Sequence, residues 1–271
     1  MTEEKIFAIN SSFGKHSIPI TSISYEPDST TAPCMIMCHG LGSNRNGYLD
    51  FYKRLSDSLF DNNIQSVRFD FRAHGDSQVD WTEFTVASQI QDLIDVCFWC
   101  KATYPNSEIR LFGTSFGAFP CVYLASLFPS IKQLYLLAPV IDYYKTFIQP
   151  STPWGVETFS NILDRSLINK ENIKIADKLF LNQDIVIELS TIDIESIISS
   201  IDVNITLMHG DNDGMVPYNV SKELAGKYSK IKFHSFKNME HGFTNKNDDD
   251  GTHSATKENF KKIVELLSRT L

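Results

Sequence analysis

The sequence predicts a single α/β domain, residues 1–271, with a mostly parallel β-sheet covered by helices on both faces. Three observations carry this prediction. From residue 34 onward, apolar β-like runs alternate with amphipathic helical stretches, which is the pattern of a parallel sheet. Polar and glycine-rich segments follow several of these runs, where such folds place their sites. A length of 271 residues with 42% hydrophobic content suits one large domain.

The strands and helices can be placed in order along the chain. We expect strands at residues 5–9, 17–25, 34–38, 66–69, 109–112, 132–137, 204–208 and 232–236. The run at 34–38 is apolar throughout, which is typical of a strand buried on both faces. Apolar residues at helical spacing predict helices at 48–60, 84–104, 119–128 and 257–271.

Residues 143–200 interrupt this alternation between two strands that one helix would otherwise join. The segment is rich in aromatic and aliphatic residues, including Trp154 and Phe159. We expect it to form a small cap between strands six and seven, with Trp154 and Phe159 lining a substrate pocket. Within it, residues 179–189 predict a short hairpin around Asn182. A decorated crossover without a role in binding is the alternative.

Composition and charge limit the classes of partner and compartment. The net charge of −8 leaves no basic surplus to meet phosphates, so we expect no nucleic-acid partner. We expect no signal peptide and no membrane span, because the longest apolar run, 134–141, is too short. Three aspartates at 248–250 are expected to form a solvated loop rather than a cation site. The odd number of cysteines, all inside apolar runs, indicates reduced core residues of a cytoplasmic protein: Cys34, Cys38, Cys97, Cys100 and Cys121.

A Gly-x-Ser-x-Gly motif at 113–117 lies between the strand at 109–112 and the helix that follows. Such a turn, called a nucleophile elbow, holds its serine in a strained conformation with the hydroxyl at the tip. Gly113 and Gly117 flank Ser115 because a Cβ atom there would collide with neighbouring backbone. Ser115 is therefore the candidate nucleophile. A Gly/Ser turn without chemical meaning is the alternative.

A serine nucleophile needs a base, and the base needs an acid, in the chain order serine, acid, histidine. His241 follows the last strand in a glycine-containing loop, which makes it the candidate base. His209 ends a strand directly before a glycine and is expected to support that turn. The acid is then Asp211 or Asp213, after the seventh strand, or Asp142, after the sixth.

An acyl-transfer site also needs two backbone N–H donors for the oxyanion. One candidate is Phe116, directly after Ser115. The other is expected in the loop after the strand at 34–38, where His39-Gly40-Leu41-Gly42 stands, and Leu41 is the candidate donor. We expect His39 to brace this loop rather than to take part in catalysis.

Five motifs occur in one order: His-Gly-x-Gly at 39–42, Asp-x-Arg-x-x-Gly-x-Ser at 70–77, Gly-x-Ser-x-Gly at 113–117, Asp-x-x-Val-Pro at 213–217 and His-Gly at 241–242. Together they resemble the α/β-hydrolase superfamily, and within it the serine aminopeptidase, monoacylglycerol lipase and cinnamoyl or feruloyl esterase branch. The resemblance implies an α/β-hydrolase fold with a mostly parallel eight-stranded sheet. It selects Asp213 as the acid and leaves Asp211 to bond its own turn. Ser115 excludes the cysteine nucleophile of dienelactone hydrolases.

The resemblance implies a serine esterase of lipase type that acts through an acyl-enzyme, with Ser115, His241 and Asp213 as its triad and without cofactor or metal. The expected substrates are short- to medium-chain or aryl carboxylic esters. Thioester or amide cleavage by the same triad is an alternative, and an aminopeptidase would need an acidic pocket. The carboxylates that the insertion offers for one are Glu157, Asp164, Glu171 and Glu188. A catalytically silent binding protein is a further alternative, and the oligomeric state is left open.

Overall fold

A computed structural model describes residues 4–12, 14, 16–24, 31–131, 133–243 and 254–269. Within them, eight strands form one sheet in the order β1-β2-β4-β3-β5-β6-β9-β10. From β4 to β10 all neighbours pair in parallel, whereas β2 is antiparallel to both β1 and β4. The predicted fold class, a mostly parallel sheet flanked by helices, is confirmed.

Each strand of the sheet lies within a few residues of its predicted range, and so do the helices beside it, except that the helix at 218–227 was not predicted. The strands are β1 (Lys5–Asn10), β2 (Ser17–Ile23), β3 (Cys34–Cys38), β4 (Gln65–Phe69), β5 (Ile109–Thr114), β6 (Gln133–Leu137), β9 (Asn204–Gly210) and β10 (Ile231–Phe236). The helices are α1 (Phe51–Asp61), α2 (Val86–Thr103), α3 (Ala118–Leu127), α7 (Tyr218–Lys227) and α8 (Ser254–Ser268). The helix expected from residue 48 begins later, because Tyr48–Asp50 form a separate turn, η1, in which Leu49 and Asp50 have positive φ.

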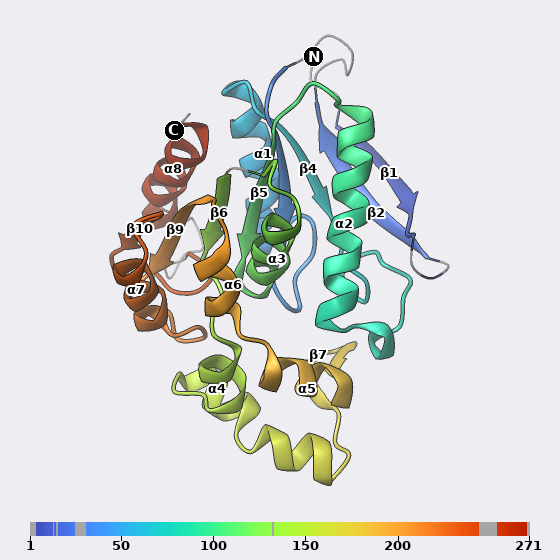
Figure 1. Ribbon diagram of the computed structural model, residues 1–271, viewed down its shortest axis with the longest axis vertical. Coiled ribbons are helices and arrows are strands. Elements are labelled where there is room, and N and C mark those ends of the chain that lie inside the picture. The colour runs from blue at the N-terminus through green and yellow to red at the C-terminus, as the bar shows by residue number, and fades with distance from the viewer. Residues whose placement is uncertain are drawn as a thin grey trace.

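Helices cover both faces of the sheet (Figure 1). The buried hydrophobic residues of the described chain form two clusters, one on each face. Leu111 of β5 packs in the cluster that holds the inner sides of α2 and α3, while its neighbour Phe112 packs with α1 and α8. Successive side chains of a strand point to opposite faces. The uniformly apolar β3 is accordingly buried on both sides, as predicted.

The segment 143–200 leaves the sheet after β6 and returns before β9. Most of it lies beyond the carboxyl ends of the strands, at the bottom of Figure 1, whereas its last helix packs on α3 beside the sheet. It contains η4 (Tyr144–Ile148), α4 (Pro153–Phe159), η5 (Asp164–Ile168), β7 (Ile173–Ala176), β8 (Leu179–Leu181), α5 (Gln183–Thr191) and α6 (Ile194–Ser200). The hairpin predicted around Asn182 is wrong. The hairpin here is formed by β7 and β8, with its turn at 177–178, and the chain after Asn182 is helical. The Asn182 side chain instead accepts from the Ile185 N–H at 3.1 Å and caps α5.

The Asp-x-Arg-x-x-Gly-x-Ser segment at 70–77 ties three parts of the fold together. The buried Asp70 carboxylate accepts from the backbone N–H groups of Arg45 and Asp76 and pairs with the Arg45 guanidinium. Gly75, with φ +55°, lies so close to Asp70 that a Cβ atom would overlap its carboxylate. This motif therefore holds the loop after β3 against the loop after β4.

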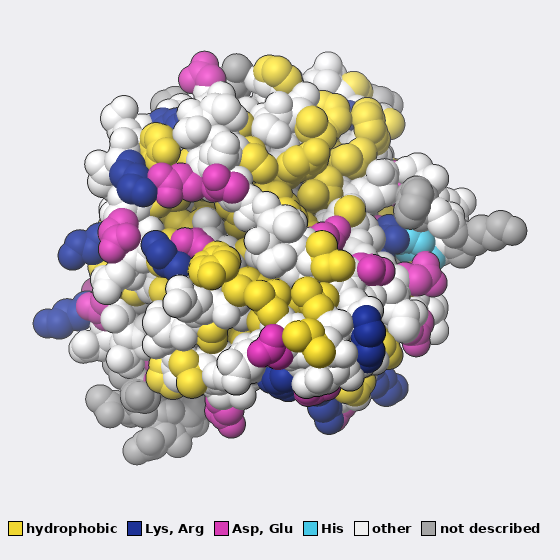
Figure 2. Space-filling view, turned by 60° about the horizontal axis from the view of Figure 1, so that its bottom comes forward, with side chains coloured by type: hydrophobic (Ala, Val, Ile, Leu, Met, Phe, Trp, Pro, Cys, Tyr) yellow, Lys and Arg dark blue, Asp and Glu magenta, His cyan; other side chains and the backbone are white. Residues whose placement is uncertain are grey.

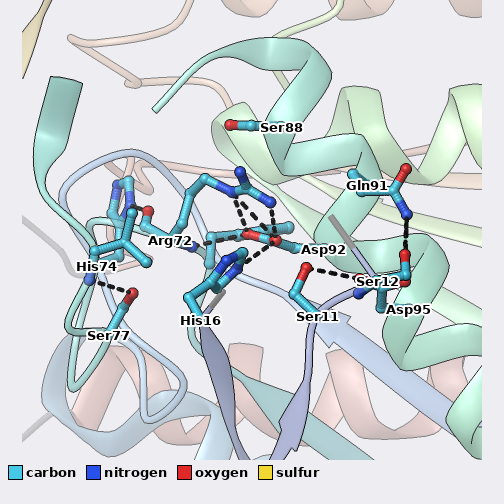
Figure 3. Close-up of polar contacts among 12 residues, drawn as sticks. Ser11, Ser12, His16, Arg72, His74, Ser77, Ser88, Gln91, Asp92 and Asp95 are labelled. Atoms are coloured by element: carbon cyan, nitrogen blue, oxygen red, sulfur yellow. Dashed lines mark hydrogen bonds and ion pairs between the residues drawn. The ribbon is translucent and has the colours of Figure 1, made fainter. Parts of the chain in front are cut away.

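Arg72 joins the same segment to α2 (Figure 3). Its Nη2 lies 2.6 Å from Oδ1 of Asp92, and its backbone N–H donates to Asp92 Oδ2 at 2.9 Å. His16 Nε2 lies 3.3 Å from the same Asp92 Oδ1. Since Arg72 and Asp92 are both buried, this ion pair anchors the loop to the helix without contact with water.

The cysteines are core residues, as predicted. All five lie in the described chain, buried and with free thiols. Burial raises the pKa of the Cys97 thiol to about 11, which keeps it protonated and unreactive. The aspartate run 248–250 lies outside the described residues. No described helix is both long enough and apolar enough to cross a membrane.

Two buried histidines, one in each of the loops after β3 and β4, predict that the protein loses stability in mild acid. His39 Nδ1–H donates to the Gly40 carbonyl at 2.8 Å and its Nε2 accepts from the Phe71 N–H at 3.1 Å, so it braces the loop as expected. Burial lowers the pKa of His39 to about 4, and burial together with His39 lowers that of His74 to about 3. An unfolded histidine titrates near pH 6.5. Between about pH 4 and 6.5 the unfolded chain therefore binds more protons, and the free energy of unfolding decreases as pH falls, by about 1.4 kcal/mol per pH unit for each histidine.

Urea unfolding between about pH 5 and pH 7 measures how steeply the free energy of unfolding changes with pH. We expect His74→Gln to reduce the slope below about pH 6 by roughly 1.4 kcal/mol per pH unit, since glutamine does not titrate. The stability of the variant relative to the native protein therefore improves as the solution becomes more acidic. An identical slope in the two proteins would contradict the burial of a neutral His74.

Candidate active site

The elbow is a strand, a sharp turn and a helix: β5, then Ser115–Gly117, then α3. Ser115 has φ +54°, a left-handed conformation that is strained for any residue with a side chain. A Cβ atom at Gly113 would lie 2.7 Å from the Ala118 Cα, and one at Gly117 would overlap the His39 carbonyl. The two glycines therefore permit the close packing that keeps the Ser115 hydroxyl at the tip of the turn.

Ser115, His241 and Asp213 meet at the carboxyl ends of β5, β10 and β9. His241 Nε2 lies 3.0 Å from Ser115 Oγ, and His241 Nδ1 lies 2.7 Å from Asp213 Oδ2. The loops that carry His241 and Asp213 touch, because Gly210 packs so closely on Met239 that a Cβ atom would overlap its carbonyl. Residues far apart in the chain thus form one continuous hydrogen-bonded row.

Four N–H donors converge on the buried Asp213 carboxylate. Oδ1 accepts from the backbone of Met215 at 2.8 Å and of Val216 at 2.9 Å. Oδ2 accepts from His241 and, at 3.0 Å, from Nε2 of His209. Burial acts to raise the pKa of Asp213, but the charges and hydrogen bonds of His241 and His209 hold it well below its usual value. Asp213 is therefore ionised at neutral pH, and each facing ring nitrogen donates.

The second histidine on Asp213 was not predicted. His209 was expected to support its turn, yet it spans from Asp213 to the Ser221 hydroxyl, which lies 2.7 Å from its Nδ1. One sequence signal pointed to this contact: His209 stands at the end of β9, four residues before Asp213. At that distance the chain can turn back, so that the imidazole faces the carboxylate.

The two other candidate acids lie elsewhere. Asp211 is exposed and accepts from the backbone N–H of Asn238 at 2.6 Å, so the expected bond to its own turn is wrong. Asp142 accepts from the backbone N–H of Lys145 at 2.9 Å and pairs with its ammonium group. Neither carboxylate contacts His241 in the described structure.

The loop after β3 lies against the elbow. A Cβ atom at Gly40 would lie 3.0 Å from the Ser115 Cβ, so glycine allows this approach. Leu41, next in the chain, and Phe116, next to the serine, line the same cavity as Ser115. The Phe116 ring is fully buried and stacks on Tyr143 with centroids 5.3 Å apart, which fixes the backbone after Ser115.

A cavity of about 160 Å³ opens beside Ser115. Of its described lining residues, Phe147 and Trp154 belong to the segment 143–200. Three more walls were not predicted: the start of α1, the ends of the central strands, and the loops that carry Asp213 and His241. Their hydrophobic lining residues are Tyr48, Phe51, Tyr52, Leu137, Val140, Met215, Val216 and Phe243.

Phe159 was predicted to line this pocket and does not. It is fully buried, and its ring packs edge-on against both Trp154 and Phe147, with centroids 4.9 Å apart in each pair. Phe159 thus supports the two aromatic residues that do line the cavity.

The segment 143–200 also carries apolar residues on its outer surface. Figure 2, turned so that this segment comes forward, shows hydrophobic side chains gathered on that face. The exposed ones in the segment include Tyr144, Val156, Ile168 and Ile187. Its apolar composition is therefore shared among core, cavity wall and surface, and does not by itself identify pocket residues.

Family models match most of the chain in two pieces. The alpha/beta hydrolase fold model matches residues 33–166, and the dienelactone hydrolase family model matches residues 190–271. The chain belongs to the α/β-hydrolase superfamily. The dienelactone hydrolase match contains Asp213 and His241 but not the elbow, where this α/β-hydrolase has a serine.

Solved structures share the fold of this α/β-hydrolase over nearly its whole length. Est1E from Butyrivibrio proteoclasticus with ferulic acid bound has a TM-score of 0.74 at 16% identity, covering 96% of this chain and 97% of its own. The Pyrococcus furiosus esterase Pf2001 has a TM-score of 0.68 at 22% identity, covering 99% and 91%. A putative hydrolase from Agrobacterium vitis S4 has a TM-score of 0.74 at 14% identity, covering 98% of both chains.

A curated relative matches a smaller part. An uncharacterised 31.7 kDa protein from the traX-finO intergenic region of Escherichia coli is 30% identical over 87 residues, which is 31% of this chain and 29% of that protein. The alignment thus spans less than a third of the relative's length.

Proposed function

We propose that the protein hydrolyses carboxylic esters through an acyl-enzyme on Ser115. The observation that carries this proposal is the continuous row from Ser115 Oγ to His241 to Asp213, with distances of 3.0 and 2.7 Å. A serine, a histidine and a buried carboxylate in this geometry are the parts that serine hydrolases share on unrelated folds. The positive φ of Ser115 supports the same reading, because strain is concentrated at functional turns.

The reaction follows from the positions of these groups. Ser115 Oγ attacks the ester carbonyl carbon while His241 Nε2 takes its proton. The N–H groups of Phe116 and Leu41 stabilise the resulting oxyanion. The tetrahedral intermediate collapses when the C–O bond to the alcohol breaks and His241 returns the proton to the leaving oxygen. Water, activated by His241, then cleaves the acyl-enzyme to release the acid and restore Ser115.

The aminopeptidase alternative has less support. A substrate with a free ammonium group would need a carboxylate in the pocket, and no described residue lining the cavity is Asp or Glu. Glu188 of the insertion is engaged elsewhere, where it accepts from the Val86 and Ala87 N–H groups at the start of α2. Glu171 pairs with Arg165. An uncharged ester fits this lining better.

The cavity size favours a small acyl group. Its volume of about 160 Å³ is close to that of an engineered cavity of about 150 Å³ that holds benzene in another protein. One aromatic ring or a short alkyl chain therefore fits beside Ser115. Est1E, whose fold is similar, binds ferulic acid, an aryl acid, which supports including aryl esters in the proposal.

Activity should depend on acyl length in a nitrophenyl ester series. Each buried methylene contributes about 0.8 kcal/mol, or roughly fourfold in kcat/KM. We expect kcat/KM to rise from acetate to butyrate or hexanoate and then to fall once the cavity is full. Trp154→Ala should flatten this profile more than it lowers activity on acetate, because it removes one wall.

Val156→Ala is the matched control, since Val156 lies on the same helix α4 but is exposed and outside the cavity. It should keep the native chain-length profile. A flat profile in the native protein, together with strong cleavage of aminoacyl anilides, would reject the ester specificity in favour of the aminopeptidase alternative.

A further inference from the structure

His209 stands behind the proposed triad and takes no part in the proton transfers of the proposed reaction. It is fully buried and is not among the residues that line the substrate cavity. Its Nε2 lies 3.0 Å from Asp213 Oδ2, the same oxygen that His241 contacts at 2.7 Å. Both rings therefore share one carboxylate oxygen.

The opposite side of the ring fixes how His209 meets that oxygen. The Ser221 hydroxyl, on α7, lies 2.7 Å from His209 Nδ1, and Ser221 is fully buried. Because an ionised carboxylate only accepts, Nε2 must carry a proton toward Asp213. A neutral imidazole then has a lone pair on Nδ1, which accepts from the Ser221 hydroxyl. Each donor therefore faces an acceptor along the chain of hydrogen bonds that runs from Ser221 through His209 and Asp213 to His241.

We propose that His209 is a positioning residue for catalysis: its Nε2–H fixes the orientation of the Asp213 carboxylate and draws charge from the oxygen that faces His241. This inference rests on the proposed function. Oδ1 is already held by two backbone N–H groups, and His209 occupies the remaining acceptor position on Oδ2. Asp213 then has one orientation, in which its bond to His241 points the imidazole at Ser115.

If His209 positions Asp213, its loss should have two kinetic effects that the loss of a purely structural residue would not have. Loss of the Nε2–H donor should lower kcat with little change in KM, since His209 lies outside the cavity. It should also move the acid limb of the kcat/KM profile to higher pH. With one donor fewer, Asp213 carries more charge toward His241 and stabilises its protonated, inactive form.

His209→Leu removes the donor, whereas His209→Gln restores an amide N–H toward Asp213 and an oxygen toward Ser221. We expect His209→Leu to lower kcat on nitrophenyl butyrate by about 10- to 100-fold, the usual effect of losing a hydrogen bond to a charged group. His209→Gln should recover kcat to within roughly threefold of the native value and restore the native acid limb. His234→Leu, on the adjacent strand β10, is the matched control and should keep both kcat and the acid limb.

If the leucine variant does not fold, His209→Asn replaces it, because the shorter amide does not reach Asp213. Native kcat in His209→Leu or His209→Asn would overturn the inference. So would equal losses in the leucine and glutamine variants with unmoved acid limbs, which indicate packing alone.

Fluorophosphonate labelling separates the positioning role of His209 from the proposed function. If the native protein is labelled at Ser115 and the His209 variants are fully active, the inference fails alone. If the native protein is not labelled, the proposed function fails.

Discussion

Replacing Ser115 with alanine is expected to lower kcat on nitrophenyl butyrate by roughly 10⁴- to 10⁶-fold, because it removes the atom that attacks the carbonyl. The fold should persist. Ser115 is half-buried at the tip of its turn, and alanine adds no atoms against Gly40. The remaining activity reflects oxyanion stabilisation and substrate binding alone.

A second serine in the cavity provides a control for this prediction. Ser43, which lines the same cavity without contacting His241 in the described structure, can be changed to alanine in parallel. Ser43→Ala should lose less than about tenfold in kcat. If Ser115→Ala retained activity within tenfold of the native protein, another group would have to be the nucleophile.

The second large effect is expected at Asp213. Asp213→Asn should lower kcat by roughly 10³- to 10⁴-fold. Four N–H groups point at this carboxylate, two at each oxygen. An amide accepts through only one atom, so its NH₂ group must face two donors in either orientation. Either His241 changes tautomer or the loop at 213–216 shifts, and in both cases the base is no longer directed at Ser115.

Asp211→Asn is the matched control, two residues away. Its carboxylate accepts a single backbone N–H, from Asn238, and the amide oxygen of asparagine can keep that bond. We expect kcat to change by less than about threefold. Reversed effects in the two variants would identify Asp211 as the acid and would contradict the geometry of the row.

The sequence predicts the site best where chemistry constrains the backbone. Gly113 is needed because β5 packs closely on the start of α3, and Gly117 because the turn packs on the end of β3 and on His39. Both requirements are visible as a motif. The parallel sheet was equally predictable, since β3 has no polar position and its burial on both faces follows. The order of motifs along the chain then placed Ser115, Asp213 and His241 at one edge of that sheet.

The pocket was less predictable, because its walls come from segments that do not form one pattern. Tyr48 and Phe51 belong to a turn and a helix that look like ordinary amphipathic structure, yet both line the cavity. Phe159 resembles Trp154 in sequence but lies behind it. Which face of α4 meets the cavity depends on tertiary contacts, such as the hydrogen bond from the Thr152 hydroxyl to the Met215 carbonyl at 2.8 Å.

His209 shows a third limit. A histidine at a strand end has several ordinary uses in a fold, and its role depends on the 3.0 Å contact with Asp213 and on the hydroxyl of Ser221, which comes from a helix twelve residues later. Periodicity carries no information on such a contact. The bond to Ser221 becomes visible only once β9 and α7 are placed relative to each other.

The acyl-enzyme on Ser115 is the central claim, and mass spectrometry of the protein after a fluorophosphonate reaction tests it most directly. We expect one adduct per chain, located by peptide mapping at Ser115, and none in Ser115→Ala. The reaction should be slowed by butyrate esters that compete for the same cavity. An adduct that persists in Ser115→Ala, or one that maps to another residue of the native protein, would contradict the account.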